Sequence, residues 1–442
     1  MQPPAPGKEK EAPKGETFGP IRMVPGVTKK NMAAFMFAAF TTIGLLTFIA
    51  TATPYVLNAN LGISGDEQGR YVGDFQVFNE IILLLIFAPA GILADRMGRR
   101  GVFAAGLLAM AVGYTVYPFA TSIFELTIFR AIYAIGIALA TGMMQTIIAD
   151  YPQGASRGKM VALVGIFNGL GVVAVNFTIA RLPGILANAG TAPLDAGRYA
   201  HWVAAGFCVL TAIVVGLGLQ KGTPHHHERD KPSLKETVLA GIVEGRRPQI
   251  ALAYASGFVA IAQRVIVGTF ITLWAVKTGI DMGLDPARAA ERGGRLFGTV
   301  MLAGLLWLPI LGPLLDRINR IAGITACMAI GTVGFLGTAL IDDPLKPVAL
   351  ALFALTGIGQ ISTFLGATVL ITHEAPLKTR GAVVGMFNMF GAAGTLVSVL
   401  VGGRIFDRID PSAPFVFMGL LTLVVMLMGI YVQIRHPEPP PQ

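Results

Sequence analysis

The stretch "IILLLIFAPAGILADRMGRR", residues 81–100, joins a long apolar run to a strongly charged end. Its first eleven residues carry no ionisable side chain, whereas its last six include Asp95, Arg96, Arg99 and Arg100. Apolar runs near or above about 18 residues recur along the chain, and such runs indicate membrane-spanning helices. The stretch therefore predicts a membrane helix that emerges at a short, charged connection.

A second string, "GPLLDRINR" at residues 312–320, repeats this pattern, and its Asp316 follows Asp95 by 221 residues. The strings "GIFNGLG" at residues 165–171 and "GMFNMFG" at residues 385–391 are 220 residues apart. Two independent strings at nearly the same offset indicate a duplicated unit. The sequence therefore predicts two related halves, each with one copy of both strings.

The whole chain has the composition of a membrane protein. Of its 442 residues, 54% are hydrophobic and 13% are charged, whereas soluble chains carry about 25% charged residues. Backbone polar groups in lipid must be satisfied within the protein, so these runs should be helices. The short alternating segments of a β-barrel are absent. We expect an all-α fold embedded in a lipid bilayer, with Cys208 and Cys327 as packing residues and no disulfide framework.

Twelve apolar spans are expected. They run over residues 31–54, 72–94, 101–119, 122–149, 159–182, 199–220, 250–277, 294–315, 321–341, 346–372, 381–404 and 413–434. With the amino terminus inside, 22 of the 34 Lys and Arg residues fall in cytoplasmic segments and 10 on the opposite side. This bias predicts cytoplasmic termini, in the inner membrane if the source is bacterial. It also accounts for the net charge of +9, so no nucleic-acid partner is predicted.

The predicted domain organisation has five parts. They are a disordered cytoplasmic tail (1–30), a six-helix bundle (31–220), a cytoplasmic central loop (221–249), a second six-helix bundle (250–436) and a carboxyl-terminal tail (437–442). A short amphipathic helix near residues 233–245 is expected to lie on the membrane surface. No Cys or carboxylate cluster accompanies His225–His227, so we expect a solvated run there and no metal or cofactor site.

The charged connection carries a family resemblance. Its residues Gly91, Asp95, Arg96, Gly98, Arg99 and Arg100 form a Gly-x-x-x-Asp-Arg-x-Gly-Arg-Arg motif. This motif resembles the signature of major facilitator superfamily transporters, and the resemblance covers residues 31–436. It implies twelve helices in two pseudo-symmetric six-helix bundles, which is one plan of secondary transporters. The copy in the second half is partial, because Asn319 stands where the glycine would be.

Further motifs resemble the same family. Asp150 through Arg157 resembles its acidic motif after the fourth helix, and Glu374 through Arg380 is a copy shorter by one residue. Arg130 loosely resembles the family's fourth-helix arginine. The Gly165-x-x-x-Gly169 pair is similar to a drug/proton antiporter motif, but Leu170 replaces its proline.

These charged positions form a predicted cytoplasmic gate. Its residues are Gly91, Asp95, Arg96, Gly98, Arg99, Arg100, Asp150, Arg157, Asp316, Arg317, Arg320, Glu374 and Arg380. A carboxylate can accept hydrogen bonds from a helix start. The resemblance places Asp95 against the helix near Gly381, and the duplication places Asp316 near Gly158. Arg99 and Arg100 can pair with Asp150 or other acids. Alternatively, the cations only hold the connections inside the cell.

Charges inside the spans are costly in lipid and mark candidate binding residues. Arg264 lies near the middle of the seventh span, and Arg130 lies in the fourth. The resemblance places the first, fourth, seventh and tenth helices around a central cavity. The predicted solute-binding residues are Arg264, Arg130, Gln263, Gln360, Tyr133, Thr51 and Tyr55. Arginine binds carboxylates through bidentate, charge-assisted hydrogen bonds.

Glu80, in the second span, is the predicted proton-coupling residue, because apolar surroundings favour the protonated form of a carboxylate. The alternative is a permanent ion pair with Arg130 or another cation. Asp74, nearer the outer surface, is the second candidate, although it also suits an interfacial position.

The predicted function is secondary active transport of a small organic solute by alternating access, in a monomer coupled to protons. The solute is an anion if Arg264 is free to bind it. If Glu80 neutralises an arginine, a multidrug/proton antiporter for neutral or amphiphilic compounds is the alternative. A non-transporting receptor or assembly factor on the same fold also stays open. No enzymatic activity is expected, since metalloprotease, nucleophile-elbow and P-loop motifs are absent.

Overall fold

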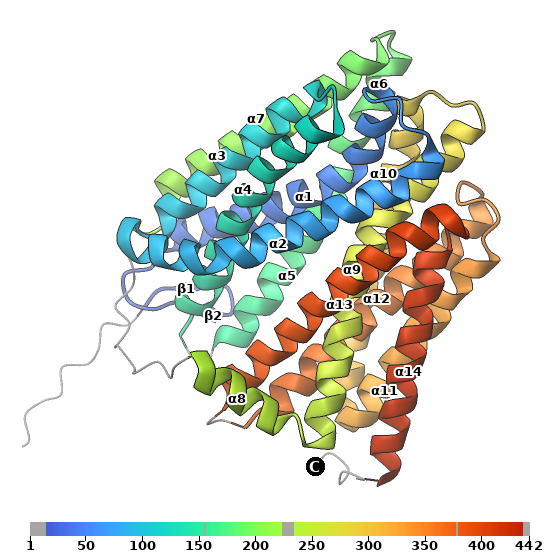
Figure 1. Ribbon diagram of the computed structural model, residues 1–442. Coiled ribbons are helices and arrows are strands. Elements are labelled where there is room, and N and C mark those ends of the chain that lie inside the picture. The colour runs from blue at the N-terminus through green and yellow to red at the C-terminus, as the bar shows by residue number, and fades with distance from the viewer. Residues whose placement is uncertain (1–14, 154–155, 223–233, 377–378, 436–442) are drawn as a thin grey trace, which may run out of the picture.

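The computed structural model describes residues 15–153, 156–222, 234–376 and 379–435 (Figure 1). The amino-terminal bundle consists of α1 (Lys29–Ala59), α2 (Gly65–Met97), α3 (Arg99–Val116), η1 (Tyr117–Phe119), α4 (Ile123–Asp150), α5 (Arg157–Phe177), η3 (Ile179–Arg181), α6 (Leu182–Asn188) and α7 (Pro193–Gly218). The carboxyl-terminal bundle consists of α9 (Pro248–Asp281), α10 (Pro286–Arg317), α11 (Arg320–Gly337), η4 (Thr338–Leu340), α12 (Pro347–Glu374), α13 (Arg380–Arg408) and α14 (Ala413–Arg435). A short hairpin, β1 (Thr17–Phe18) and β2 (Ile21–Arg22), precedes the first bundle, and α8 (Leu234–Glu244) precedes the second.

Among the described residues, eleven helices are long and apolar enough to cross a membrane. A further helix, α2, is 33 residues long, and Glu80 is the sole ionisable residue between its Val77 and Ala94. With α2 the membrane helices fall into two groups of six, one in each bundle. The predicted all-α fold with twelve membrane helices is confirmed.

Three helices begin earlier than the apolar runs predicted: α2 at Gly65, α7 at Pro193 and α10 at Pro286. Each first turn carries a charged side chain (Asp66, Asp195 and Arg288), and that of α10 is also capped. The Asp285 carboxylate accepts hydrogen bonds of 3.0 Å from the N–H groups of Ala287 and Arg288 at the start of α10. Hydropathy misses such turns, because they extend the helix beyond the apolar core.

Close helix pairs repeat between the bundles. In the first bundle α3 packs against α4 at Gly106, where a Cβ would lie 2.7 Å from the backbone nitrogen of Ala140. In the second, α11 packs against α12 at Gly359, where a Cβ would lie 2.9 Å from the Cα of Gly331. Glycines let membrane helices approach closely. The duplication in sequence is therefore also a duplication in packing.

The two bundles touch at one end of the molecule and separate toward the other (Figure 1). We call the end with the β1–β2 hairpin and α8 the tail end, and the opposite end the far end. At the far end Gly73 lies against Val399 and Gly403, and Gly294 lies against Ala180. These contacts join α2 to α13 and α10 to η3.

The tail end differs from the prediction of a disordered segment over residues 1–30. Ile21 and Met23 are fully buried, and the described residues 15–28 pack beside the connection between α4 and α5. The N–H of Gln153 donates to the Arg22 carbonyl (2.9 Å). Buried apolar residues alternate in this segment, as in a strand, and no long apolar run reveals it. Residues 1–14 lie outside the described chain.

Helix α8 confirms the short helix expected near residues 233–245. It packs on the start of α13 and is fixed by the Tyr254 hydroxyl, which donates to the Gly241 carbonyl (2.9 Å). Leu239, Ile242 and Val243 are exposed, as suits a helix on a membrane surface. His225–His227 lies outside the described residues, and the described residues hold no cluster of three metal-ligating side chains.

Gly171→Ala should destabilise the amino-terminal bundle, because a Cβ there would collide with the Phe40 carbonyl of α1. We expect a loss of about 1–3 kcal/mol, as for other overpacked sites, seen as a lower melting temperature in detergent. Gly165→Ala is the matched control on the same helix, since a Cβ added there would have no atom within 4 Å. Equal melting temperatures for both variants would contradict the packing.

Candidate functional site

Arg264 is the exposed residue of an otherwise enclosed helix. From Pro248 to Ile280 every other residue of α9 is buried or half-buried. A helix that faces lipid exposes a stripe of side chains, so a single exposed residue indicates a space inside the protein. The Arg264 guanidinium carbon lies 4.5 Å from the centre of the Phe364 ring on α12. No carboxylate of the described residues forms an ion pair with it, so its charge is available to a ligand.

Gln360 offers a second polar group on α12. It lies one helical turn before Phe364, the residue under Arg264, and is 6% exposed. Its Oε1 atom has no hydrogen-bond partner among the described residues. Because buried polar atoms are normally hydrogen-bonded, this atom is suited to a solute or water donor.

Gln263, predicted to bind solute, faces the interior of its own bundle. It is fully buried, and its Nε2 donates to the Thr422 hydroxyl of α14 (2.7 Å). Its Oε1 accepts from the Thr363 hydroxyl of α12. Both ends of the amide are thus occupied. In this state Gln263 ties three helices together, and its role in solute binding stays a prediction.

Arg130 and Tyr133 are also buried within one bundle. Arg130 is 4% exposed, and its Nη1 donates to the Thr53 hydroxyl of α1 (3.1 Å). Tyr133 is fully buried, and its hydroxyl donates to the Leu46 carbonyl (3.1 Å). In this state Tyr133 is a packing residue instead of the predicted ligand. Arg130 keeps an unpartnered Nε among the described residues.

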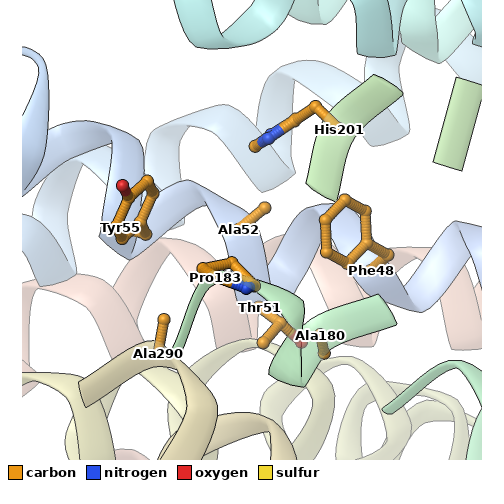
Figure 2. A pocket seen from close by; sticks show the side chains of 8 residues that line it. All are labelled: Phe48, Thr51, Ala52, Tyr55, Ala180, Pro183, His201 and Ala290. Atoms are coloured by element: carbon orange, nitrogen blue, oxygen red, sulfur yellow. The ribbon is translucent and has the colours of Figure 1, made fainter. Parts of the chain in front are cut away.

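Thr51 and Tyr55 lie together near the far end. They line a small pocket with His201 of α7 and Ala290 of α10 (Figure 2). Thr51 donates to the Asn176 side chain (3.3 Å), and the Tyr55 hydroxyl donates to the Pro193 carbonyl. The structure does not bring them to Arg264, which is not among the lining residues of that pocket.

Glu80 is half-buried on α2 and accepts a hydrogen bond from the Gln76 side chain (3.1 Å). Among the described residues it forms no ion pair. The alternative of a permanent pair with Arg130 is therefore absent from this state, and the proton-coupling role of Glu80 stays a prediction.

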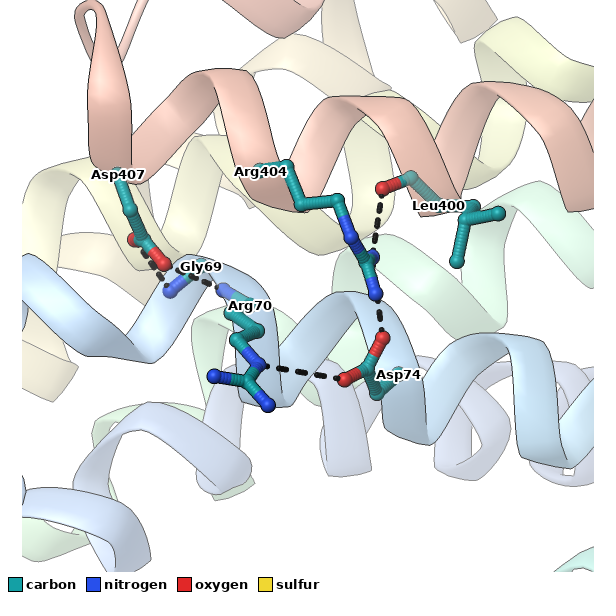
Figure 3. A network of polar contacts seen from close by, with 6 residues as sticks. All are labelled: Gly69, Arg70, Asp74, Leu400, Arg404 and Asp407. Carbon is teal, nitrogen blue, oxygen red and sulfur yellow. Dashed lines mark hydrogen bonds and ion pairs between the residues drawn. The ribbon is translucent and has the colours of Figure 1, made fainter.

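Asp74, the second proton candidate, is an interfacial residue (Figure 3). Its carboxylate lies 3.1 Å from Arg404 of α13 and 3.9 Å from Arg70 of its own helix. Asp74 therefore joins the two bundles, and a role as proton carrier stays a prediction.

Asp407 adds a second contact at the same place. Its carboxylate accepts hydrogen bonds from the backbone N–H groups of Gly69 (2.8 Å) and Arg70 (2.7 Å) in the first turns of α2 (Figure 3). A carboxylate near a helix start is favourable, because the helix dipole is positive there. This is the arrangement predicted for Asp95, found here at the far end.

A related ion pair closes the opposite edge of the far end. Arg181 of η3 lies 3.1 Å from Glu291 of α10. The two arginines are related by the duplication, since Arg181 follows α5 and Arg404 lies near the end of its counterpart α13. The two acids are also related, since Glu291 lies in α10 and Asp74 lies in its counterpart α2. The far end is thus held by two ion pairs in corresponding positions of the duplicated halves.

A third cross-bundle ion pair joins Lys277 of α9 to Asp66 of α2 (2.9 Å). Sequence reasoning missed all three pairs because most of these residues lie at or beyond the span ends. For two of the pairs the available signal was an acid and an arginine at roughly corresponding places in the two halves, since Glu291 follows Asp74 by 217 residues and Arg404 follows Arg181 by 223.

At the tail end, Arg99 and Asp150 form an ion pair, one of those that the sequence allowed. Arg320 and Glu374 form its counterpart in the second bundle, at 3.9 Å. Each pair joins neighbouring helices of one bundle, α3 to α4 and α11 to α12. These pairs therefore stabilise the bundles and do not connect them.

The contact between bundles that was predicted at the tail end stays a prediction. Gly158 and Gly381, the predicted helix starts, have open space around them, as does Gly91. The side chains of Asp95 and Asp316 lie outside the described residues. The other gate cations are exposed or half-exposed: Arg96, Arg100, Arg157, Arg317 and Arg380.

Two turn residues shape the tail-end connections. Gly98 joins α2 to α3 with φ of 81°, a conformation that glycine adopts readily. In the second half Asn319 occupies the corresponding place and caps α11, since its side chain accepts from the N–H groups of Ile321 and Ala322. Asparagine is a good helix cap, which explains why the partial motif still gives the same connection.

The family model of the Major Facilitator Superfamily matches residues 35–397 and 293–442 of this chain. The chain belongs to the Major Facilitator Superfamily. It is a multi-pass integral membrane protein with the architecture of this transporter superfamily.

Two relatives cover nearly the whole chain. The magnetosome protein MamH of Paramagnetospirillum magneticum is 27% identical over 407 residues, which are 90% of this chain and 91% of that protein. Multidrug resistance protein 1 of Bacillus subtilis is 25% identical over 419 residues, which are 93% of this chain and 97% of that protein. The solved nucleoside transporter NupG has the same superfamily fold, with a TM-score of 0.69 and 13% identity over 91% of this chain and 99% of that chain.

Arg404→Glu should loosen the far end, because it replaces an attraction to Asp74 with a repulsion. We expect the labelling rate of Ala290→Cys, at a position that is 2% exposed, to rise about two- to fivefold with a water-soluble maleimide, as suits a surface ion pair. Adding Asp74→Arg should restore the slow rate. Arg408→Glu, on the same helix end, is the control. Unchanged labelling in Arg404→Glu would contradict a closing role.

Proposed function

We propose that this protein is a secondary active transporter that moves a small organic anion by alternating access. The observation that carries the proposal is Arg264: a cation within the membrane-spanning part of α9, exposed, stacked on Phe364 and without a carboxylate partner among the described residues. An unpaired charge inside a membrane is costly and marks a substrate pathway. A carboxylate-bearing solute would supply the missing charge and accept a bidentate hydrogen bond.

The arrangement of the two bundles fits one step of an alternating-access cycle. The far end is closed by Asp74–Arg404, Arg181–Glu291 and Asp66–Lys277, and the tail end is open around Gly158 and Gly381. The excess of cations on the tail-end segments supports a cytoplasmic tail end. We therefore assign the inward-facing state, in which solute exchanges with the cytoplasm.

In the other half of the cycle the far-end pairs break and the tail end closes. The bundles, residues 31–220 and 250–436, rock as two units joined by the central segment 221–249. We assign the closing contacts to Asp95 with the α13 start at Gly381 and to Asp316 with the α5 start at Gly158. Their N–H groups are suited to a carboxylate, as Asp407 on α2 illustrates.

Glu80 is the proposed proton carrier. It lies within the apolar part of α2, has Gln76 as its hydrogen-bond partner and has no ion pair among the described residues. Such a carboxylate can bind and release a proton at modest cost. A monomer suffices for the mechanism, because one chain supplies both bundles.

Export of amphiphilic drugs is the second candidate. The similarity to Multidrug resistance protein 1 favours it, and the exposed aromatic and apolar side chains Met389 and Phe390 of α13 would suit such compounds. The unpaired charge of Arg264 favours the anion. The two functions differ in the charge of the solute that binds.

Arg264→Ala should weaken binding of the anion. A thermal-shift screen of purified protein with mono- and dicarboxylates identifies the solute, because a ligand stabilises the folded state. We expect affinity for that solute to fall at least about tenfold, as suits loss of a charged hydrogen bond worth about 1.5–3 kcal/mol. Arg435→Ala is the matched control, since Arg435 stacks on the surface ring of Tyr431. If ethidium raised the melting temperature and none of the carboxylates did, drug export would be favoured instead.

Glu80→Gln should uncouple solute movement from the pH gradient, since the amide cannot carry a proton. In liposomes, accumulation driven by a pH gradient should be lost while exchange of labelled for unlabelled solute persists. Glu67→Gln, in the exposed first turn of the same helix, should behave as the native protein. Proton-driven accumulation at the native rate in Glu80→Gln would remove Glu80 from the coupling step.

A further inference from the structure

The small pocket near the far end lies on the seam between the two bundles (Figure 2). Its lining residues are Phe48, Thr51, Ala52 and Tyr55 of α1, Ala180 of η3, Pro183 of α6, His201 of α7 and Ala290 of α10. Ala290 is the contribution of the carboxyl-terminal bundle, and the next residue, Glu291, forms the closing pair with Arg181. The cavity volume of about 10 Å³ is close to the space of a single water.

His201 is the titratable side chain of this pocket with an unused hydrogen-bonding atom. It is 1% exposed, and its Nδ1 lies 2.8 Å from the Gly197 carbonyl. A carbonyl only accepts, so Nδ1 carries the hydrogen and Nε2 is the free acceptor of a neutral ring. Nε2 has no hydrogen-bond partner among the described residues. Figure 2 shows the ring reaching from α7 across Ala52 of α1.

The surroundings of His201 disfavour a positive charge. Its ring packs against Phe48 (5.3 Å between centroids) and Tyr117 (5.9 Å), and no carboxylate of the described residues pairs with it. The titratable and charged groups on the elements around it are Tyr55 (α1), Tyr114 (α3), Tyr117 (η1), Arg130 (α4), Arg181 (η3), Glu291 (α10), and Asp195, Arg198 and Cys208 (α7). Glu291 and Asp195, the acids of this group, are engaged with Arg181 and Arg198.

We propose that His201 is a proton-binding site whose occupancy is coupled to opening of the far end. While the end is closed, a protonated ring would be a buried charge without a counterion, which is unfavourable. When α10 moves away with Ala290 and Glu291, water reaches Nε2 and the protonated ring becomes solvated. The proton therefore binds the open state more tightly than the closed state.

Linkage fixes the direction of the response. A ligand that binds one state better shifts the population toward that state, so acid on the far side favours opening of the far end. Above the titration range of His201 the ring is neutral in both states, and the preference vanishes. Protonation of His201 thus couples acidity on the far side to opening of the closing ion pairs, independently of Glu80. The inference depends on the alternating opening proposed above, but not on the identity of the solute.

The first test measures the far end directly. Leu194→Cys on α7 and Leu340→Cys in η4 are exposed sites on opposite bundles, and spin labels there report the opening by double electron–electron resonance in nanodiscs. We expect longer distances to gain population between about pH 7.5 and about pH 5, the range in which histidine titrates. His201→Asn and His201→Gln should remove this shift, and His373→Gln, at an exposed tail-end histidine, should retain it.

A native protein without a shift, or a full shift in both His201 variants, would overturn the proposal. The readout is a distance and needs no solute flux. A negative result with Arg264→Ala would therefore leave the His201 proposal standing. A negative result in this distance measurement would leave the proposed transport of the anion standing.

The second test uses the native residue, so it holds even if the His201 variants do not fold. Deuterium exchange at the C2–H of individual histidines, read by mass spectrometry, reports access of solvent to each ring. We expect His201 to exchange at least about tenfold more slowly than His373, as suits a site reached through opening. Arg404→Glu should accelerate the exchange at His201, and Arg408→Glu should not. Exchange at His201 as fast as at His373 would overturn the proposal.

Discussion

Three ion pairs at one end of the molecule determine how the two bundles meet. Lipid forces the chain into apolar helices, because backbone polar groups there need internal partners, and the ionisable residues are left mainly to the helix ends. Asp74–Arg404, Arg181–Glu291 and Asp66–Lys277 use those helix ends to join the bundles. Partly exposed ion pairs are weak, so they hold one arrangement without making it permanent. In this structure the bundles that these pairs join at the far end separate toward the tail end (Figure 1).

The two arginines inside the spans differ in burial, and this difference distinguishes a structural residue from a candidate binding residue. Arg130 is enclosed and hydrogen-bonded to Thr53, so one of its hydrogen-bond donors is satisfied within its own bundle. Arg264 rests on Phe364, and no acid among the described residues satisfies its charge. The duplication supplies two similar bundles, but it does not supply two similar sites. The asymmetry between these arginines favours a solute preference set by the carboxyl-terminal half.

Hydropathy and amphipathic patterning predicted the helices and α8, because these depend on which residues avoid water, and the repeated strings predicted the duplication. They did not predict the direction in which individual side chains leave a helix. Gln263 and Arg264 are neighbours, yet their side chains leave α9 about 100° apart, and one faces Thr422 while the other is exposed. His201 falls at the end of its predicted span, because the polar first turns of α7 hid the true start at Pro193. Pairing across the bundles, as at Asp74, requires tertiary contacts that no single span reveals.

The hairpin at residues 15–28 breaks the symmetry that the duplication created. The carbonyl of its Arg22 accepts from Gln153 beyond α4, and Asn31 at the start of α1 donates to the Gly218 carbonyl at the end of α7. The amino-terminal bundle is therefore clamped at its tail end by this segment, whereas in the other bundle α8 packs on the start of α13 and is fixed by the hydrogen bond from Tyr254 to the Gly241 carbonyl. The two bundles share an ancestry, yet each is braced at its tail end by a different segment, so the tail end is where the duplicated halves differ most in their supporting contacts.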